Sequence, residues 1–154
     1  MTDRPQWTRG ARIGVDVGKV RIGLASCDPD GLLATPVRTV ARATKPGDAS
    51  DLAEIADVVR EYDAVEVVVG LPVTLAGQER QAAGEVREFA QRLAGVVAPV
   101  PVRLTDERMS TVVATRRLSE RGVRGRRRRT VVDQAAAVEI LQGWLDAQRR
   151  HRDA

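Results

Sequence analysis

The sequence is poor in the residues that build most metal and redox sites. Its 154 residues include one cysteine and one histidine, and aromatic residues make up only 3%. A lone cysteine, Cys27, excludes an internal disulfide and a thiolate zinc cluster, and His151 belongs to a polar stretch at the C-terminus. Any metal site must therefore rest on carboxylates. The scarcity of aromatic residues also argues against a base-stacking platform for single-stranded nucleic acid.

The sequence also lacks an apolar run long enough to span a membrane, and its first ten residues lack the hydrophobic segment of a secretory signal. These absences predict a soluble, cytoplasmic protein. The length and an apolar content of 43% suit one domain with a real core. We expect a flexible N-terminal tail over residues 1–10, a single domain over 11–148 and a polar C-terminal tail over 149–154.

The positive charge is concentrated in one segment. The formal net charge is +4, yet the stretch from Arg116 to Arg129 holds eight arginines and one acid, Glu120, which leaves −3 for the rest of the chain. A patch of this kind suits a polyanion such as nucleic acid. The alternative is a solvated loop that binds nothing.

The hydrophobic pattern predicts an α/β fold with the order β-β-β-α-β-α-β-α-α. Three strands joined by short turns indicate an antiparallel meander, and the later strands, alternating with helices, indicate parallel pairing, so we expect a mixed five-stranded sheet flanked by helices. Pro36 within the third strand favours an edge position or a bulge. The expected strands begin at Arg12 and cover Arg21 to Cys27, Leu32 to Val40, Ala64 to Gly70 and Val100 to Thr105. The expected helices begin near Ser50 and cover Glu79 to Leu93, Ser110 to Arg121 and Thr130 to Gln148.

Asp16 is the most unusual residue of the first strand. Ile13, Val15 and Val17 alternate with Gly14, Asp16 and Gly18, so a strand would turn Asp16 away from the apolar set. The flanking glycines would leave room beside the carboxylate for a hydrated metal or a phosphate, and a buried carboxylate needs a cation or hydrogen bonds. An Asp held by the amides of a following turn is the alternative.

Two further acidic positions occur where elements begin or end. Asp106 and Glu107 follow the strand that ends at Thr105, although either could bond the amides of the next helix. Asp133 lies at the fourth position of T-V-V-D, a capping-box pattern, but it also shares a helical stripe with apolar residues. A mere cap would face water more often, so the stripe favours a site. Those apolar residues are Ala136, Ala137, Ile140 and Trp144.

Carboxylates without histidine or cysteine are hard-oxygen ligands that suit Mg²⁺ or Mn²⁺. Two such ions can clamp an in-line displacement at phosphorus. An acidic cluster beside a basic patch is the arrangement expected of a nuclease, in which cations hold the nucleic-acid backbone. The expected phosphate contacts are Lys19, Arg21, Arg108, Arg124, Arg126, Arg127, Arg128 and Arg129.

Four ordered blocks resemble the YqgF/RuvX family. They are D-V-G-K-V-R-I-G-L-A from Asp16, V-V-G-L-P from Val68, D-E-R-M-S-T from Asp106 and V-D-Q-A-A-A-V-E-I-L-Q from Val132. The resemblance covers about Arg12 to Leu145.

The resemblance implies a ribonuclease H-like fold related to the RuvC resolvases. It implies a metal-dependent nuclease with Asp16, Glu107 and Asp133 as its acidic triad, acting on the 5′ end of pre-16S ribosomal RNA, on Holliday junctions, or on both. Asp106 is an additional candidate metal ligand. The chain departs from the family at Val20, where a basic residue is usual, and at Thr74 and Ala76, where Asn and Asp are usual.

Two other functions compete with the nuclease hypothesis. D-x-G before a hairpin also begins the phosphate-binding lobe of actin-like phosphotransferases, but those need a second lobe that this length does not accommodate. A non-catalytic RNA-binding or ribosome-binding module would use the arginines alone. The oligomeric state could be a monomer or a homodimer, and an intermolecular disulfide through Cys27 competes with a buried, inert thiol.

Overall fold

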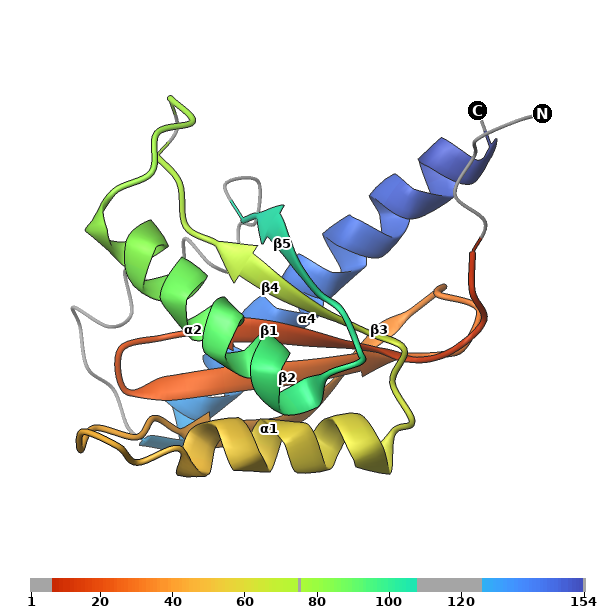
Figure 1. Ribbon diagram of the computed structural model, residues 1–154. Coiled ribbons are helices and arrows are strands. Elements are labelled where there is room, and N and C mark those ends of the chain that lie inside the picture. The colour runs from red at the N-terminus through yellow and green to blue at the C-terminus, as the bar shows by residue number, and fades with distance from the viewer. Residues whose placement is uncertain (1–6, 75, 108–125, 154) are drawn as a thin grey trace.

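The computed structural model describes residues 7–74, 76–107 and 126–153, and the side chains of α4 are described from Asp133 to Arg152. Five strands form one mixed sheet in the order β3-β2-β1-β4-β5 (Figure 1). The strands are β1 Arg12–Val17, β2 Arg21–Cys27, β3 Ala34–Ala41, β4 Glu66–Leu71 and β5 Val102–Asp106. The helices are α1 Ser50–Glu61, α2 Gln81–Val97 and α4 Arg126–Asp153.

The pairing of the strands confirms the predicted mixed sheet. β1 pairs antiparallel with β2, and β2 pairs antiparallel with β3. β4 pairs in parallel with both β1 and β5. The run of valines in β4 is buried on both faces of the sheet, as a continuous apolar strand requires.

Pro36 lies where its missing N–H is tolerated. β3 is an edge strand, and the register between β2 and β3 shifts between Leu24, opposite Arg38, and Ala25, opposite Pro36. An edge and a bulge are the two positions at which a strand accepts proline, and here both occur together.

The two faces of the sheet are covered by different helices. α1 and α2 pack on one face, where Ile13, Val15, Val67 and Val69 join the larger core cluster. α4 crosses the other face diagonally and encloses a second cluster that includes Ala25 and Val68 (Figure 1). Successive side chains of each strand therefore point alternately toward the layer of α1 and α2 and toward α4.

The last helix is longer than the sequence pattern indicates. We expected a basic loop up to Arg129 and a polar tail from Arg149, yet α4 runs from Arg126 to Asp153. Arginine is a good helix former, so the run at the beginning contains nothing that would end a helix. At the far end, Arg149 Nη1 donates to the carbonyl oxygen of Gly31 at 2.8 Å, which ties the polar turns to the β2–β3 connection.

Trp7, within the predicted N-terminal tail, contacts the rest of the domain. Trp7 Nε1 donates to the carbonyl oxygen of Pro29 at 3.1 Å, and the Arg12 guanidinium lies 3.6 Å from the centroid of the Trp7 ring. The stretch from Trp7 to Gly10 therefore belongs to the packed structure. The predicted helix from Ser110 to Arg121 lies outside the described residues.

Cys27 ends β2 and is 7% exposed. Its Sγ accepts the backbone N–H of Arg12 at 3.3 Å, and burial raises the pKa of the thiol above its ordinary value. This environment is that of a small buried side chain and not of a reactive thiol. Across the described ranges, no helix has the length and apolar content needed to cross a bilayer.

A candidate carboxylate site at the ends of three strands

Asp16 lies on the face of β1 that α4 covers. Its neighbours Ile13 and Val15 point into the core beneath α1 and α2, so the predicted alternation is confirmed. Asp16 itself is only 1% exposed. A carboxylate this deeply buried needs compensating interactions, and Asp16 does make contacts with its surroundings.

Two glycines stand beside Asp16 on the neighbouring strands. Gly23 of β2 is its antiparallel partner. On the other side, the parallel register pairs Val15 with Val69, so the next residue of β4, Gly70, lies beside Asp16. Neighbouring strands are about 4.8 Å apart, and because both neighbours of Asp16 are glycines, other parts of the chain can approach the sheet closely on either side of it.

Gly23 makes room for Asp133. A Cβ placed on Gly23 would lie 2.1 Å from the backbone oxygen of Asp133, so α4 rests directly on the β2 backbone at this point. Asp133 is 2% exposed and faces the sheet. The apolar stripe predicted for this helix is confirmed, because Ala136, Ala137 and Ile140 are buried with it.

Gly70 makes room for Glu107. A Cβ on Gly70 would lie 3.0 Å from Glu107 Oε2 and 2.6 Å from Ile140 Cδ1. Glu107 follows β5 directly and is 6% exposed, and its backbone N–H continues the ladder by donating to the Leu71 oxygen at 3.3 Å. Because β5 pairs with β4, the Glu107 side chain lies near Gly70, which is itself the neighbour of Asp16 across the sheet.

Gly14 and Gly18, two positions before and after Asp16, do not have the role that we expected. A Cβ on Gly14 would meet Leu141 Cβ at 2.7 Å, and a Cβ on Gly18 would meet the Arg21 oxygen at 2.6 Å. The first position lets α4 approach the sheet, and the second tightens the β1–β2 turn. Neither leaves space for a phosphate or a hydrated metal, so that prediction is wrong.

Arg21 neutralises one of the three acids. Its Nε donates to Asp133 Oδ2 at 2.8 Å, and its side chain is 19% exposed. That Arg21 contacts phosphate stays a prediction; in the structure its Nε donates to a carboxylate. Asp133 is buried and Arg21 is partly buried, so removal of the arginine would leave the Asp133 carboxylate without this partner in a region of low dielectric.

The capping alternative for Asp133 fails on the helix bounds. α4 begins at Arg126, so Asp133 is two turns inside the helix. A cap acts only in the first turn, where backbone N–H groups lack partners. Burial of Asp133 against the sheet therefore needs another explanation.

Asp106 does not lie on the face of the sheet that carries Asp16 and Glu107. It pairs with Leu71, whose side chain belongs to the core beneath α1 and α2, whereas Glu107 lies at Gly70 on the α4 face. Asp106 is exposed. Successive residues of a strand alternate between faces, which separates the two adjacent acids.

The predicted phosphate contacts are only partly described. Lys19 is exposed in the β1–β2 turn. Arg108 and Arg124 lie outside the described residues, and for the four arginines that begin α4 the helix is described but the side chains are not. Those four are Arg126, Arg127, Arg128 and Arg129.

The acids of this face match a divalent cation in chemistry. They offer hard oxygen donors, as Mg²⁺ and Mn²⁺ prefer. Over the residues that the structure describes, however, no three His, Cys, Asp or Glu side chains already stand at metal-binding spacing. One oxygen of the Asp133 carboxylate, Oδ2, accepts the hydrogen bond from Arg21 Nε.

Sequence reasoning missed the two glycines that define the site and the arginine that pairs with it. Gly23 and Gly70 are single glycines inside strand patterns, in R-I-G-L-A and V-V-G-L-P. Such glycines often mark a close approach of other atoms to the strand. That signal was present in the sequence, but the partner of each glycine lies far along the chain.

A protein-family model described as "RuvX: Holliday junction resolvase" matches residues 10–147. Curated proteins with the name "Putative pre-16S rRNA nuclease" are similar over nearly the whole chain. One from Rhodococcus erythropolis is 59% identical over 92% of this chain and 81% of its own length. Another, from Streptomyces coelicolor, is 54% identical over 96% of this chain and 86% of its own length.

A solved structure supports the fold. The structure of Thermus thermophilus RuvC in complex with a Holliday junction substrate has a TM-score of 0.54 and 16% sequence identity, covering 92% of this chain and 97% of RuvC. At this identity the similarity shows the fold alone. It confirms the ribonuclease H-like architecture that the sequence led us to expect.

Proposed function

The chain belongs to the RuvX family and is a nuclease acting on phosphodiester bonds, and we propose that Asp16, Glu107 and Asp133 form its metal-binding catalytic centre. Membership of a nuclease family argues against the actin-like phosphotransferase. The observation that supports the proposal is the row of Gly23, Asp16 and Gly70, because a Cβ on Gly23 would lie 2.1 Å from the backbone oxygen of Asp133 and a Cβ on Gly70 would lie 3.0 Å from Glu107 Oε2.

The chemistry of the site follows from its burial. Asp16, Glu107 and Asp133 are each more than nine-tenths buried on one face of the sheet. Buried carboxylates need hydrogen bonds or cations around them. Arg21 pairs with Asp133, and we propose that one or two Mg²⁺ or Mn²⁺ ions bind among the three carboxylates.

When bound, the divalent ions would activate water and stabilise the leaving oxygen of the phosphodiester. Asp16 on β1, Glu107 directly after β5 and Asp133 on α4 would hold the ions through their carboxylate oxygens. We do not propose Asp106 as a metal ligand.

The experiment compares isosteric variants on two substrates. Asp16→Asn should lower Mg²⁺-dependent cleavage at least about 100-fold, because metal stabilisation of the transition state is worth several kcal/mol and each 1.36 kcal/mol is a factor of ten. Binding of the nucleic acid should change little. The substrates are a precursor 16S ribosomal RNA fragment and a synthetic four-way DNA junction.

Asp106→Asn is the matched control. It removes a carboxylate adjacent in sequence to Glu107 but on the other face of the sheet, so cleavage should stay within about twofold of wild type. An active Asp16→Asn enzyme would rule out the proposed centre. RNA binding without any Mg²⁺-dependent cleavage by pure wild-type protein would instead favour the non-catalytic binding module.

The two substrates make different demands on assembly. A four-way junction has two strands to cut, which calls for a two-fold dimer, whereas a precursor RNA end does not. We propose pre-16S ribosomal RNA as the first substrate to test, because the similar proteins from Rhodococcus and Streptomyces carry that name. Processing of a ribosomal precursor would place the enzyme in the cytoplasm, in contact with the assembling ribosome.

A further inference from the structure

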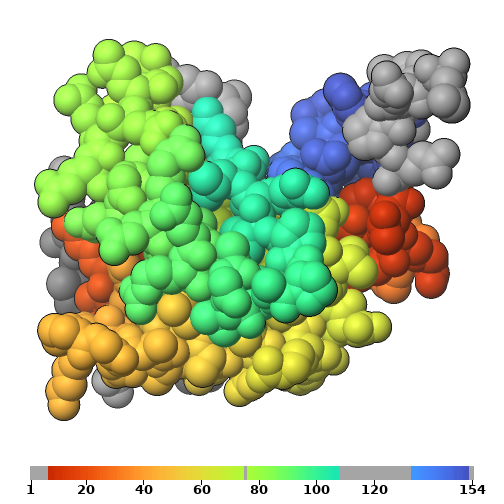
Figure 2. Space-filling model, in the orientation of Figure 1, coloured from red at the N-terminus to blue at the C-terminus, as the bar shows by residue number. Residues whose placement is uncertain are grey.

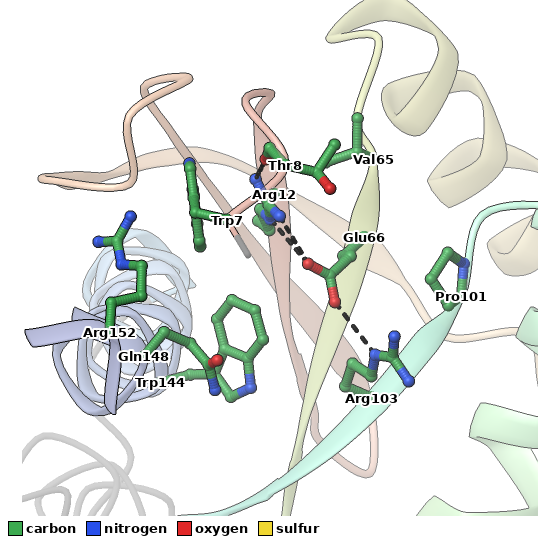
Figure 3. Close-up of a pocket in the computed structure, with 10 residues that line it drawn as sticks. All are labelled: Trp7, Thr8, Arg12, Val65, Glu66, Pro101, Arg103, Trp144, Gln148 and Arg152. Atoms are coloured by element: carbon green, nitrogen blue, oxygen red, sulfur yellow. Dashed lines mark hydrogen bonds and ion pairs between the residues drawn. The ribbon is translucent and has the colours of Figure 1, made fainter. Parts of the chain in front are cut away.

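A pocket of about 450 Å³ lies at the end of the sheet opposite the carboxylates. It is bordered by the beginnings of β1, β4 and β5 and by the C-terminal turns of α4 (Figure 3). The surface is hollowed between the blue α4 and the teal β5 (Figure 2). The residues that matter here are Trp7, Arg12, Glu66, Arg103, Trp144 and Arg152.

The pocket and the carboxylate site share one face of the sheet. Arg12 is four residues before Asp16 on β1, and Arg103 is four residues before Glu107 along β5. At about 3.3 Å per residue, each separation is roughly 13 Å along the strand. A nucleic-acid strand that reaches the carboxylates could follow β5 into the pocket.

Both tryptophans of the chain line this pocket. Their ring centroids are 6.4 Å apart with the planes at 47°. Trp7 is held between two arginines, with the Arg12 guanidinium 3.6 Å and that of Arg152 4.7 Å from its ring centroid (Figure 3). Trp144 instead projects from α4 toward Glu66 and Arg103, across the hollow of the pocket.

The pocket also carries positive charge. Glu66 accepts from Arg12 Nη2 at 2.7 Å through one carboxylate oxygen and from Arg103 Nε at 3.0 Å through the other. Arg152 adds a third guanidinium, so three cations face one anion in the lining. Arg103 is 55% exposed and can reach a ligand without leaving the sheet.

We propose that this pocket binds one nucleotide unit of the nucleic-acid substrate, with the base stacked on Trp144 and the adjoining phosphate contacted by Arg103 and Arg152. An aromatic ring beside guanidinium groups is the combination that recognises a base and its phosphate. The inference rests on the proposed function, since it assigns the pocket to the substrate of that same site. The pocket would bind the nucleic-acid strand at a second point, away from the phosphodiester bond that is cleaved.

The test uses the tryptophans as reporters. A single-stranded RNA of about 12 nucleotides is titrated into wild-type protein in EDTA, which prevents cleavage. Intrinsic fluorescence reports on the pocket, because Trp7 and Trp144 are the only tryptophans, and anisotropy of a labelled RNA measures affinity independently. Saturation of both signals at the same protein-to-RNA ratio is expected.

Two pocket variants separate stacking from charge. Trp144→Leu, which keeps apolar bulk on α4, should weaken binding about 5- to 150-fold, as expected for loss of one stacked base. Arg103→Gln should reduce the slope of log affinity against log salt by about 0.7, the value for one phosphate contact on a single strand. Arg92→Gln removes an exposed charge from α2 and should leave that slope within error of wild type.

Three results would overturn the inference. The first is RNA binding by anisotropy with no change in fluorescence. The second is an equal loss of affinity in Arg103→Gln and Arg92→Gln, which would make the pocket no different from the general surface. The third is tight binding of adenosine monophosphate that the RNA does not displace, which would make this a free-nucleotide site. Cleavage measured separately in Mg²⁺ distinguishes failure of this inference from failure of the proposed nuclease centre.

Discussion

Gly23→Ala should damage the site through a single methyl group. The added Cβ would lie 2.1 Å from the backbone oxygen of Asp133, whereas ordinary contact begins at 3.4 Å. Relief of this contact requires α4 to move away from β2 by about 1.3 Å, because backbone atoms cannot rotate aside as a side chain can. The displaced segment of α4 carries Asp133.

Two effects of this displacement can be estimated. Overpacking of a well-packed interface typically costs about 1–3 kcal/mol, so the urea midpoint should fall with an unchanged slope. A misplacement of about 1 Å in a catalytic group can lower the rate about 100-fold. Single-turnover cleavage in saturating Mg²⁺ should therefore fall by more than the loss of folded protein explains.

Gly143→Ala is the matched control on the same helix. A Cβ at Gly143 would meet nothing within 4 Å, so the substitution should stabilise the protein by about 0.5–1 kcal/mol through helix propensity. Its cleavage rate should equal that of wild type. Wild-type stability and wild-type cleavage in Gly23→Ala would refute the claim that this glycine exists to admit Asp133.

Two further predictions follow from buried groups. Arg21→Gln should lower the free energy of unfolding by about 3 kcal/mol without metal, the low end of the cost of removing one partner of a buried pair, because it leaves Asp133 uncompensated. Mg²⁺ should then raise the melting temperature more than in wild type, since no guanidinium competes for that carboxylate; equal shifts would contradict this. Because burial raises the pKa of Cys27 from its ordinary value of 9.0, the unfolded chain loses that proton first, and stability should fall as pH rises above about 9. Denaturation at pH 8 and pH 10 should show a smaller drop in Cys27→Ala, whereas identical drops would exclude this contribution.

The two tryptophans show that amino-acid composition alone does not rule out a stacking site. The low aromatic content of the chain argued against a base-stacking platform for single-stranded nucleic acid. Composition counts residues, however, and does not place them. Trp7 comes from the N-terminal segment and Trp144 from the last helix, and only the crossing of α4 over the sheet brings their rings within 6.4 Å.

Local pattern was sufficient for the order of the elements and for two of the three acids, Asp16 and Asp133. Alternation in β1 turned Asp16 away from Ile13 and Val15, and helical spacing placed Asp133 on the buried stripe of α4, because both periodicities follow from backbone geometry alone. The ends of α4 were not predictable in the same way. The polar turns near Arg149 are held by the distant Gly31.

The sequence by itself determined the order of the elements along the chain, the faces of the first strand, and the positions of Asp16 and Asp133 on faces that are buried. Only the tertiary structure decided which atoms surround Asp16. The glycines that admit other acids proved to be Gly23 and Gly70, on the neighbouring strands, and not Gly14 and Gly18 beside it in the chain. Strand pairing sets these neighbours across distances that no local periodicity encodes, and close packing then allows no side chain at either position.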